Sequence, residues 1–241
     1  MRVELQPAYL LHSRKISDSR LLVDFFTRDY GVVGAVARAP SKKKPAYATF
    51  SPALVSWLGK GGLKTLVDYE LTRVSSPRLA GVPLYCGFYL NELLQRLLPK
   101  GEACPALFEA YRATIAELSH TAPHPDQAVL LIHLEPLLRE FELRVLEELG
   151  YLVDFSHDAS TGQPLEEARR YYLDVNSGFS EVGRPAWPTF DGKVILAMGQ
   201  RDFSDTTMLG AMKMMTRVLL SPVLGSKPLK SRELFASVKT R

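Results

Sequence analysis

Two absences limit what this chain can be: it has very little cysteine and no long apolar run. The only cysteines among its 241 residues are Cys86 and Cys104. Without a CxxC pair they cannot build a structural zinc site unless several histidines contribute, so we expect neither a metal nor a cofactor. No stretch approaches the roughly 20 apolar residues of a membrane helix, and the start MRVELQPAYLLHSRK lacks the pattern of a signal peptide. We therefore expect a cytoplasmic protein that does not contact a membrane.

The motifs of common enzyme classes are also missing. The sequence has no GxSxG, HExxH or GxGxxG pattern. The glycine-rich stretch 58–65 ends in Lys-Thr but lacks the spacing that wraps backbone amides around phosphates, so it predicts a hairpin turn. Adjacent acids such as Glu147 and Glu148 face different directions on a helix and cannot share a proton. We expect a protein without catalytic residues, although catalytic groups can converge from distant positions.

Acidic residues are absent between Asp29 and Asp68. Six cations lie in this segment: Arg38, Lys42, Lys43, Lys44, Lys60 and Lys64. From Thr206 to Arg241, seven cations stand against the single acid Glu233. The segment from Asp68 to Asp205 has 21 acids and 12 cations, so the net charge of the whole chain is only +4. Two basic segments on a nearly neutral chain favour binding of a polyanion, most commonly nucleic acid, although solvated charges also cluster by chance.

Residues 1 to about 75 have the pattern of closely spaced strands. Apolar runs at 8–12, 21–27, 32–37, 53–58 and 64–71 are separated by turns and loops, several of which contain glycine. Five short strands suit a small closed barrel, because closure removes exposed sheet edges. The OB-fold is the five-stranded barrel that commonly binds oligonucleotides.

The loop expected between the third and fourth strands combines cations with aromatic neighbours. Two prolines and the run 42–44 predict a loop rather than a helix or strand. Phosphates pair with cations and bases stack on rings, so this composition suits a single nucleic-acid strand. Tyr47 is the better stacking candidate, whereas Phe50 and especially Trp57 are also explained as core residues of the barrel.

After Pro77 the apolar spacing becomes helical. Helices are predicted at 83–98, 105–118, 126–149, from about 192, at 206–220 and at 231–238. Pro136 either kinks the third of these or begins another helix, and Gly150 fits a C-cap. Residues 151–190 are expected to be irregular, with one hairpin strand at 171–175. The predicted fold class is α+β: a five-stranded OB-fold β-barrel over residues 1–78 that binds DNA, followed by a mainly α-helical domain over 79–241.

Segments along the whole chain resemble the RecO family of bacterial recombination mediators. The string GSKPLKSRELF at 225–235 is similar to the family's closing signature, and LYCGFYLNELL at 84–94 is similar to its first long helix. Residues 9–14 and 24–27 resemble its first two strands. Residues 139–143, followed by 149–151, resemble its central helix and cap. The resemblance therefore covers nearly the whole sequence in order.

The resemblance implies a DNA repair and recombination function without covalent catalysis. Family members have an N-terminal OB-fold and a helical C-terminal domain. They bind single-stranded and double-stranded DNA, anneal complementary strands and, with RecR, load RecA onto DNA coated by single-strand-binding protein. Some relatives carry a four-cysteine zinc element after the central helix. Residues 151–190 of this chain contain no cysteine, so zinc is not expected.

The helical domain of relatives accepts the acidic, phenylalanine-ended tail of single-strand-binding protein. Arg139 matches a basic position implicated in that contact, and a cation beside an apolar groove can pair a terminal carboxylate. The other explanation of Arg139 is an ion pair on the helix surface with Glu135 or Glu142. The sequence leaves both explanations open.

The candidate DNA-binding residues are taken from the two basic segments. They are Arg38, Lys42, Lys43, Lys44, Tyr47, Lys60, Lys64, Lys227, Lys230 and Arg232. An OB-fold adaptor that binds RNA, or only proteins, is the alternative function. The expected location is the cytoplasm, with association with the nucleoid during repair.

Overall fold

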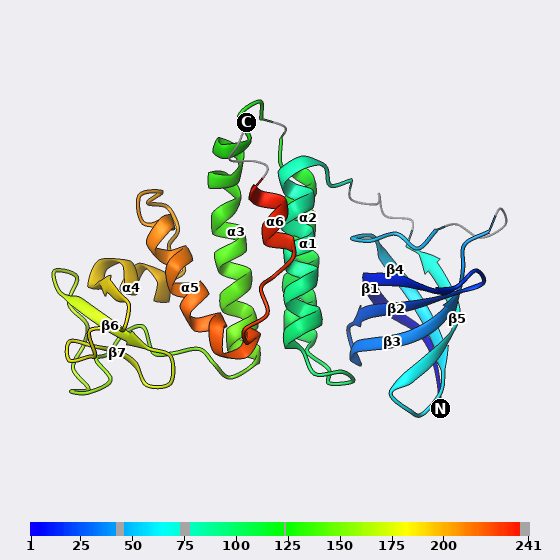
Figure 1. Cartoon of the computed structure of the whole chain (residues 1–241), viewed down its shortest axis with the longest axis horizontal. Helices are drawn as coiled ribbons and strands as arrows, with labels where there is room; N and C mark the ends of the chain where they lie inside the picture. Colours follow the sequence, from blue (N-terminus) through cyan, green and yellow to red (C-terminus); the bar gives the residue numbers. More distant parts are fainter. Residues whose placement is uncertain (42–45, 73–77, 123, 237–241) are drawn as a thin grey trace. The chain divides into compact units, whose positions relative to one another are not determined.

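The computed structural model describes residues 1–41, 46–72, 78–122 and 124–236 (Figure 1). The chain forms two compact units, Met1–Pro123 with Leu229–Arg241, and His124–Pro228. The first unit thus contains helices as well as the barrel. The domain boundary at residue 78, which follows the change from strands to helices, stays a prediction.

A closed five-stranded barrel begins the first unit. Its strands are β1 (Arg2–Ser17), β2 (Arg20–Thr27), β3 (Gly31–Arg38), β4 (Pro52–Leu58) and β5 (Leu63–Leu71). They follow the order β1-β2-β3-β5-β4, and β4 pairs back on β1. Neighbours are antiparallel except β3 and β5, which run parallel. The predicted fold class, an OB-type barrel followed by helices, is confirmed.

Side chains at alternate strand positions fill the barrel. Val23 and Phe25 of β2 meet Val55 and Trp57 of β4 in one buried cluster. This alternation is the period-two pattern expected of strands with one buried face. Trp57 is 2% exposed, which confirms its assignment to the core rather than to a binding surface.

Strand β1 is longer than the run 8–12 that predicted it. Its first half pairs with β4 and its second half with β2, so the strand serves two neighbours. Leu5, with φ of 51°, lies where the register with β4 shifts. Residues after Leu11 are exposed and polar for the most part, so they carry no apolar pattern from which the strand could be predicted.

Helices of the first unit share a core with the barrel. They are α1 (Gly81–Leu97), α2 (Pro105–His120) and the short α6 (Ser231–Ala236). The rings of Tyr9 and Tyr111 pack edge to face with centroids 5.1 Å apart. Asn91 donates a hydrogen bond to the Leu11 carbonyl at 3.0 Å and accepts one from the Tyr111 hydroxyl at 2.6 Å. These buried contacts join β1, α1 and α2 in one structure.

The second unit combines helices with a small sheet. Its elements are α3 (Gln127–Glu148), β6 (Arg170–Asp174), β7 (Gly178–Ser180), β8 (Thr189–Asp191), α4 (Gly192–Gly199) and α5 (Leu209–Leu224). The strands form an antiparallel sheet of order β7-β6-β8. The expectation of irregular structure with one hairpin strand was therefore wrong for β7 and β8. Each has three residues, too few to show a period.

The long helix α3 is continuous. Pro136 lies inside it, so the alternative of a second helix beginning there is wrong. At its end Gly150 adopts φ of 72° and donates to the Glu147 carbonyl, while the Tyr151 N–H reaches the Leu146 carbonyl at 2.8 Å. This pair of bonds is the Schellman arrangement and confirms the predicted C-cap. Within the described residues, no helix combines the length and the hydropathy of a membrane span.

Candidate nucleic-acid interface

The seam between β3 and β5 opens into a cleft. The two strands pair through Gly34–Val36 and Leu63–Thr65. Both continue beyond this pairing, β3 to Arg38 and β5 to Leu71. A cavity of about 680 Å³ lies where they diverge. This volume is within the range of about 300–1,000 Å³ that is usual for small-ligand sites.

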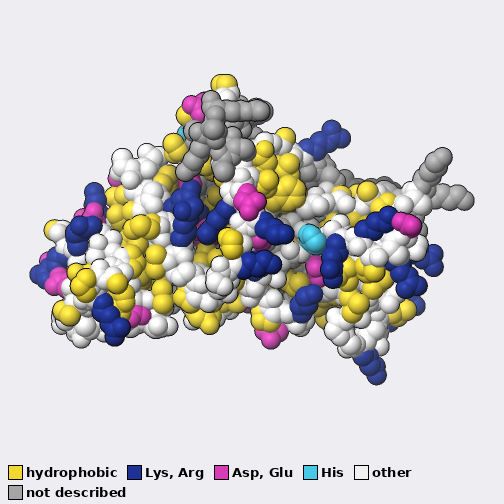
Figure 2. Space-filling view, viewed as in Figure 1, with side chains coloured by type: hydrophobic (Ala, Val, Ile, Leu, Met, Phe, Trp, Pro, Cys, Tyr) yellow, Lys and Arg dark blue, Asp and Glu magenta, His cyan; other side chains and the backbone are white. Residues whose placement is uncertain are grey.

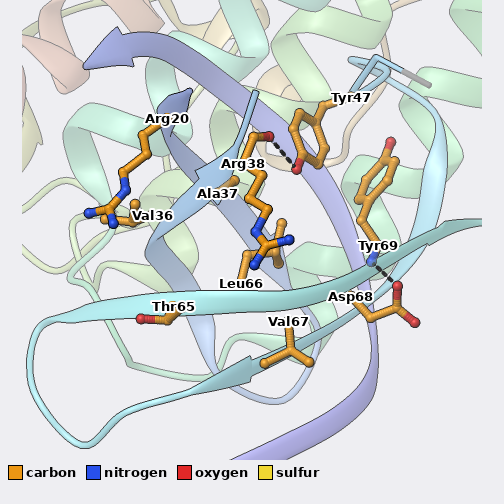
Figure 3. A pocket seen from close by; sticks show the side chains of 10 residues that line it. All are labelled: Arg20, Val36, Ala37, Arg38, Tyr47, Thr65, Leu66, Val67, Asp68 and Tyr69. Carbon is orange, nitrogen blue, oxygen red and sulfur yellow. Dashed lines mark hydrogen bonds between the residues drawn. The ribbon is translucent and has the colours of Figure 1, made fainter. Parts of the chain in front are cut away.

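Side chains from β2, β3, β5 and the segment before β4 line this cleft (Figure 3). They are Arg20, Val36, Ala37, Arg38, Tyr47, Thr65, Leu66, Val67, Asp68 and Tyr69. Four are apolar, and the other six supply guanidinium, phenol, hydroxyl and carboxylate groups. A cleft in which polar groups converge beside apolar side chains is a common form of binding site.

Arg20 and Arg38 lie directly opposite each other in the β2–β3 ladder. Like charges at opposed positions destabilise a sheet pair. Among the described residues, neither arginine forms an ion pair with a carboxylate. In Figure 3 the Arg38 side chain extends from β3 toward Leu66 of β5. A phosphate bound here would offset the repulsion between the two guanidinium groups.

Tyr47 and Tyr69 form an aromatic wall of the cleft. Their ring centroids are 5.0 Å apart, edge to face. The Tyr47 hydroxyl donates to the Arg38 carbonyl at 3.0 Å, and the Tyr69 hydroxyl accepts from the Ala48 N–H at 3.0 Å. Burial raises the pKa of both hydroxyl groups above the ordinary value for tyrosine. The predicted stacking residue Tyr47 thus lies at the cleft, and its stacking on a base stays a prediction.

Two other candidates in the first basic segment, Lys60 and Lys64, do not line the cleft. Lys60 is exposed on the β4–β5 hairpin. Lys64 is half-buried, and its Nζ donates to the Gly61 carbonyl at 2.6 Å. The run 42–44 lies outside the described residues. The structure therefore gathers only part of the predicted set, and the role of these lysines stays a prediction.

The candidates in the second basic segment lie near the end of the chain. Lys230 is exposed and Arg232, at the start of α6, is half-buried. Lys227 is exposed and belongs to the second unit. None of the three lines the cleft. On the barrel face drawn in Figure 2, Lys and Arg side chains are scattered with few acidic side chains among them.

Sequence reasoning missed Arg20, Asp68 and Tyr69. Arg20 could have been found, because paired residues of a hairpin can be counted back from its turn. The turn at 28–30 brings Thr27 opposite Gly31 and therefore Arg20 opposite Arg38. Asp68 and Tyr69 enter the cleft because β5 stops pairing with β3 after Thr65. No local pattern reports where two strands that are distant in sequence separate.

Arg139 on α3 is buried, with 3% of the residue exposed. Its Nη1 donates to Glu135 at 2.5 Å, and its Nη2 and Nε donate to Glu142 at 2.6 and 2.8 Å. Lys213 of α5 also pairs with Glu135. The predicted ion pair is present with both carboxylates, but its location on the helix surface was wrong. A role of Arg139 in binding a partner tail stays a prediction.

The loop after α3 is organised by a carboxylate. Asp158, 4% exposed, accepts from the Ser160 hydroxyl at 2.6 Å and from the backbone N–H groups of Ser160, Thr161 and Glu181 at 2.7, 3.0 and 2.8 Å. Burial raises the pKa of Asp158, but these hydrogen bonds outweigh it and lower the pKa to about 2. Among the described residues, no group of three His, Cys, Asp or Glu side chains is placed to hold a metal ion.

Comparison with known proteins shows to which family this chain belongs. Residues 1–74 match the family domain described as "Recombination protein O N terminal", and residues 78–233 match "Recombination protein O C terminal". The chain belongs to the RecO family. A RecO of Cellvibrio japonicus, named DNA repair protein RecO, is 42% identical over 241 residues, 98% of each chain. Proteins of the same name from Glaesserella parasuis and Hahella chejuensis are 42% and 39% identical, over 97% and 98% of this chain and 95% and 96% of their own.

Proposed function

We propose that this protein is a DNA repair and recombination mediator. It binds single-stranded and double-stranded DNA, anneals complementary strands and, with RecR, helps to load RecA onto DNA coated by single-strand-binding protein. Relatives that share about two fifths of its residues over nearly their whole length are named DNA repair protein. Because the identical residues extend over nearly the whole chain, they support a function in common with these relatives and not only a common barrel fold.

The observation that carries the proposal is the pair Arg20 and Arg38 beside the aromatic wall of the cleft. Nucleic acid offers phosphates for the guanidinium groups and base faces for Tyr47, and both requirements are met at one place. Phosphate contacts carry no sequence information, so binding should be general. A protein that holds backbones and leaves base edges free can bring two complementary strands together against their mutual repulsion.

The lysines of the first basic segment, Lys42, Lys43, Lys44, Lys60 and Lys64, are proposed to bind further phosphates of the same DNA. Neutralising about six phosphates gives a log–log slope of binding against salt of roughly −4 for single strands and roughly −5 for duplex. Reversal of Lys42, Lys43 and Lys44 to Glu should weaken binding to all sequences alike. A change of sequence preference after this reversal would contradict the assignment of these lysines to phosphates.

The proposed partner surface lies on the second unit, which would accept the acidic tail of single-strand-binding protein. Arg139 is buried between two carboxylates, so we propose that it acts by holding the surface of α3 rather than by reaching the tail carboxylate. The conservative change Arg139→Lys should then weaken tail binding in proportion to the loss of stability of this unit. Weakened tail binding with unchanged stability would instead indicate direct contact.

The test is annealing of two complementary oligonucleotides coated with single-strand-binding protein, intact or without its tail. Acceleration that depends on the tail supports both the pairing activity and the partner surface. No acceleration with either form would overturn the proposal, and binding of structured RNA would then favour the OB-fold adaptor. Incubation of the same DNA with Mg²⁺ or Mn²⁺ should leave it intact, because we propose no nuclease activity.

A further inference from the structure

Asp68 is the carboxylate of the cleft, and nothing in the proposed phosphate contact requires it. A negative charge beside two arginines that bind phosphate would weaken that binding by repulsion. Yet Asp68 lines the same cavity as Arg20 and Arg38. No ion pair with a described residue accounts for its carboxylate. Asp68 is exposed, so a donor group of a ligand in the cleft could replace the water around this carboxylate.

The orientation of Asp68 is fixed by the backbone. Its Oδ1 accepts a hydrogen bond from the Tyr69 N–H at 3.0 Å, drawn as a dashed line in Figure 3. A carboxylate has about four lone-pair sites, so this bond leaves most of its accepting capacity, and all of that of Oδ2, available. Asp68 is thus a hydrogen-bond acceptor at the edge of the cleft, and its carboxylate is oriented by the Tyr69 N–H.

The cleft has room for one unstacked base. Its volume of about 680 Å³ lies between two strands of the barrel and beside Tyr47, whose ring offers a stacking surface. A base pair within duplex keeps its hydrogen-bonding edge occupied and cannot present it to Asp68. The geometry therefore suits a base from a single strand whose phosphate lies on the arginines.

We propose that this cleft admits one unpaired base and that Asp68 makes guanine the preferred one. Guanine presents two adjacent donors, N1–H and the N2 amino group, which a carboxylate can accept together. Thymine presents one N–H between two carbonyl oxygens, which repel a carboxylate. Cytosine and adenine present an amino group next to a ring acceptor, so their affinity for Asp68 should lie between those of guanine and thymine. This inference rests on the proposed DNA binding and adds a base preference to it.

The test measures binding of a labelled thymidine strand of about 16 nucleotides, with and without one central dG, by fluorescence anisotropy. The wild-type chain should bind the strand with dG about fivefold more tightly or better, as expected for a two-bond contact with a base edge. The same dG within a fully paired duplex should give no preference. Asp68→Ala should abolish the preference while raising affinity for the thymidine strand, because it removes a negative charge.

Glu70→Ala is the matched control. It removes the same charge from the same strand, at a residue that does not line the cleft. It should raise affinity for both strands and keep the preference for dG. A preference that survives Asp68→Ala, or its absence in the wild type with DNA binding intact, overturns this inference and leaves the proposed function standing. Failure to bind either strand at low salt would instead contradict the proposed function.

Discussion

The carboxylate of Glu92 on α1 holds Ser231, the first residue of α6. It accepts hydrogen bonds from the Ser231 N–H at 2.8 Å, from the Ser231 hydroxyl at 2.6 Å and from the Lys230 N–H at 2.9 Å. Burial raises the pKa of Glu92, but these bonds and the nearby Arg96 lower it overall. Glu92 and Ser231 belong to the two segments that most resemble the RecO family. The similarity of these two segments to the family is therefore explained in part by a contact that stabilises the fold.

Loss of this contact should release the last helix. Glu92→Ala leaves the first N–H groups of α6 without a partner, at an expected cost of about 1–3 kcal/mol in the free energy of unfolding. Hydrogen exchange of residues 229–236 should accelerate while that of the barrel strands is unchanged. Glu117→Ala, on the exposed face of α2, is the control and should change neither. Equal exchange in the two variants would mean that Glu92 does not hold α6.

The buried ion pairs of Arg139 predict a large effect on stability. Arg139→Ala leaves Glu135 and Glu142 buried without their partner, and removal of one member of such a network costs about 3–5 kcal/mol. Urea denaturation should show this loss in the second unit. Arg144→Ala on the same helix removes half-exposed pairs with Glu140 and Glu147 and should cost less than about 1 kcal/mol. Similar losses for the two variants would contradict the burial of Arg139.

The loop around Asp158 should respond to acid. Because the folded-state pKa of about 2 is below the usual value, ionised Asp158 stabilises the loop above pH 4 or so, and this contribution is lost as pH falls toward 2. Asp158→Asn should lower the unfolding free energy at pH 7 by about 1–3 kcal/mol. The difference between the wild type and the variant should shrink steadily in melts taken from pH 5 down to the lowest pH at which both remain folded. A difference that does not change over this range would contradict the assignment.

Gly31 tests the contact between the β2–β3 turn and the segment before α2. Its φ is +57°, and an added Cβ would lie 1.8 Å from the carbonyl oxygen of Glu102, a backbone atom that cannot rotate away. Gly31→Ala should therefore destabilise the first unit by about 3 kcal/mol, as measured by thermal denaturation. Gly61→Ala, where an added Cβ meets nothing within 4 Å, should have little effect. A tolerated Gly31→Ala would mean that the turn and this segment separate readily.

The barrel could be predicted because short apolar runs follow one another, separated by turns and loops. Helices α1 to α3 were predictable from apolar spacing, and Gly150 from its position after the last turn of α3. Strands β7 and β8 are too short for any period, and the burial of Arg139 depends on how α3 packs. Of the cleft residues, the sequence analysis predicted only Arg38 and Tyr47, although Arg20 could have been found from the register of the hairpin. Asp68 and Tyr69 enter the cleft because two strands far apart in sequence separate, which is a property of the closed barrel.

The central claim is that Arg20 and Arg38 bind the phosphates of DNA. The most direct measurement is the salt dependence of single-strand binding for the wild type and for Arg20→Gln/Arg38→Gln. Two lost phosphate contacts should reduce the log–log slope by about 1.4 and weaken binding at low salt. The control, Arg169→Gln/Arg170→Gln, makes the same change in net charge at arginines already paired with carboxylates, and should leave the slope unchanged. Equal slopes for the two double variants would contradict the claim.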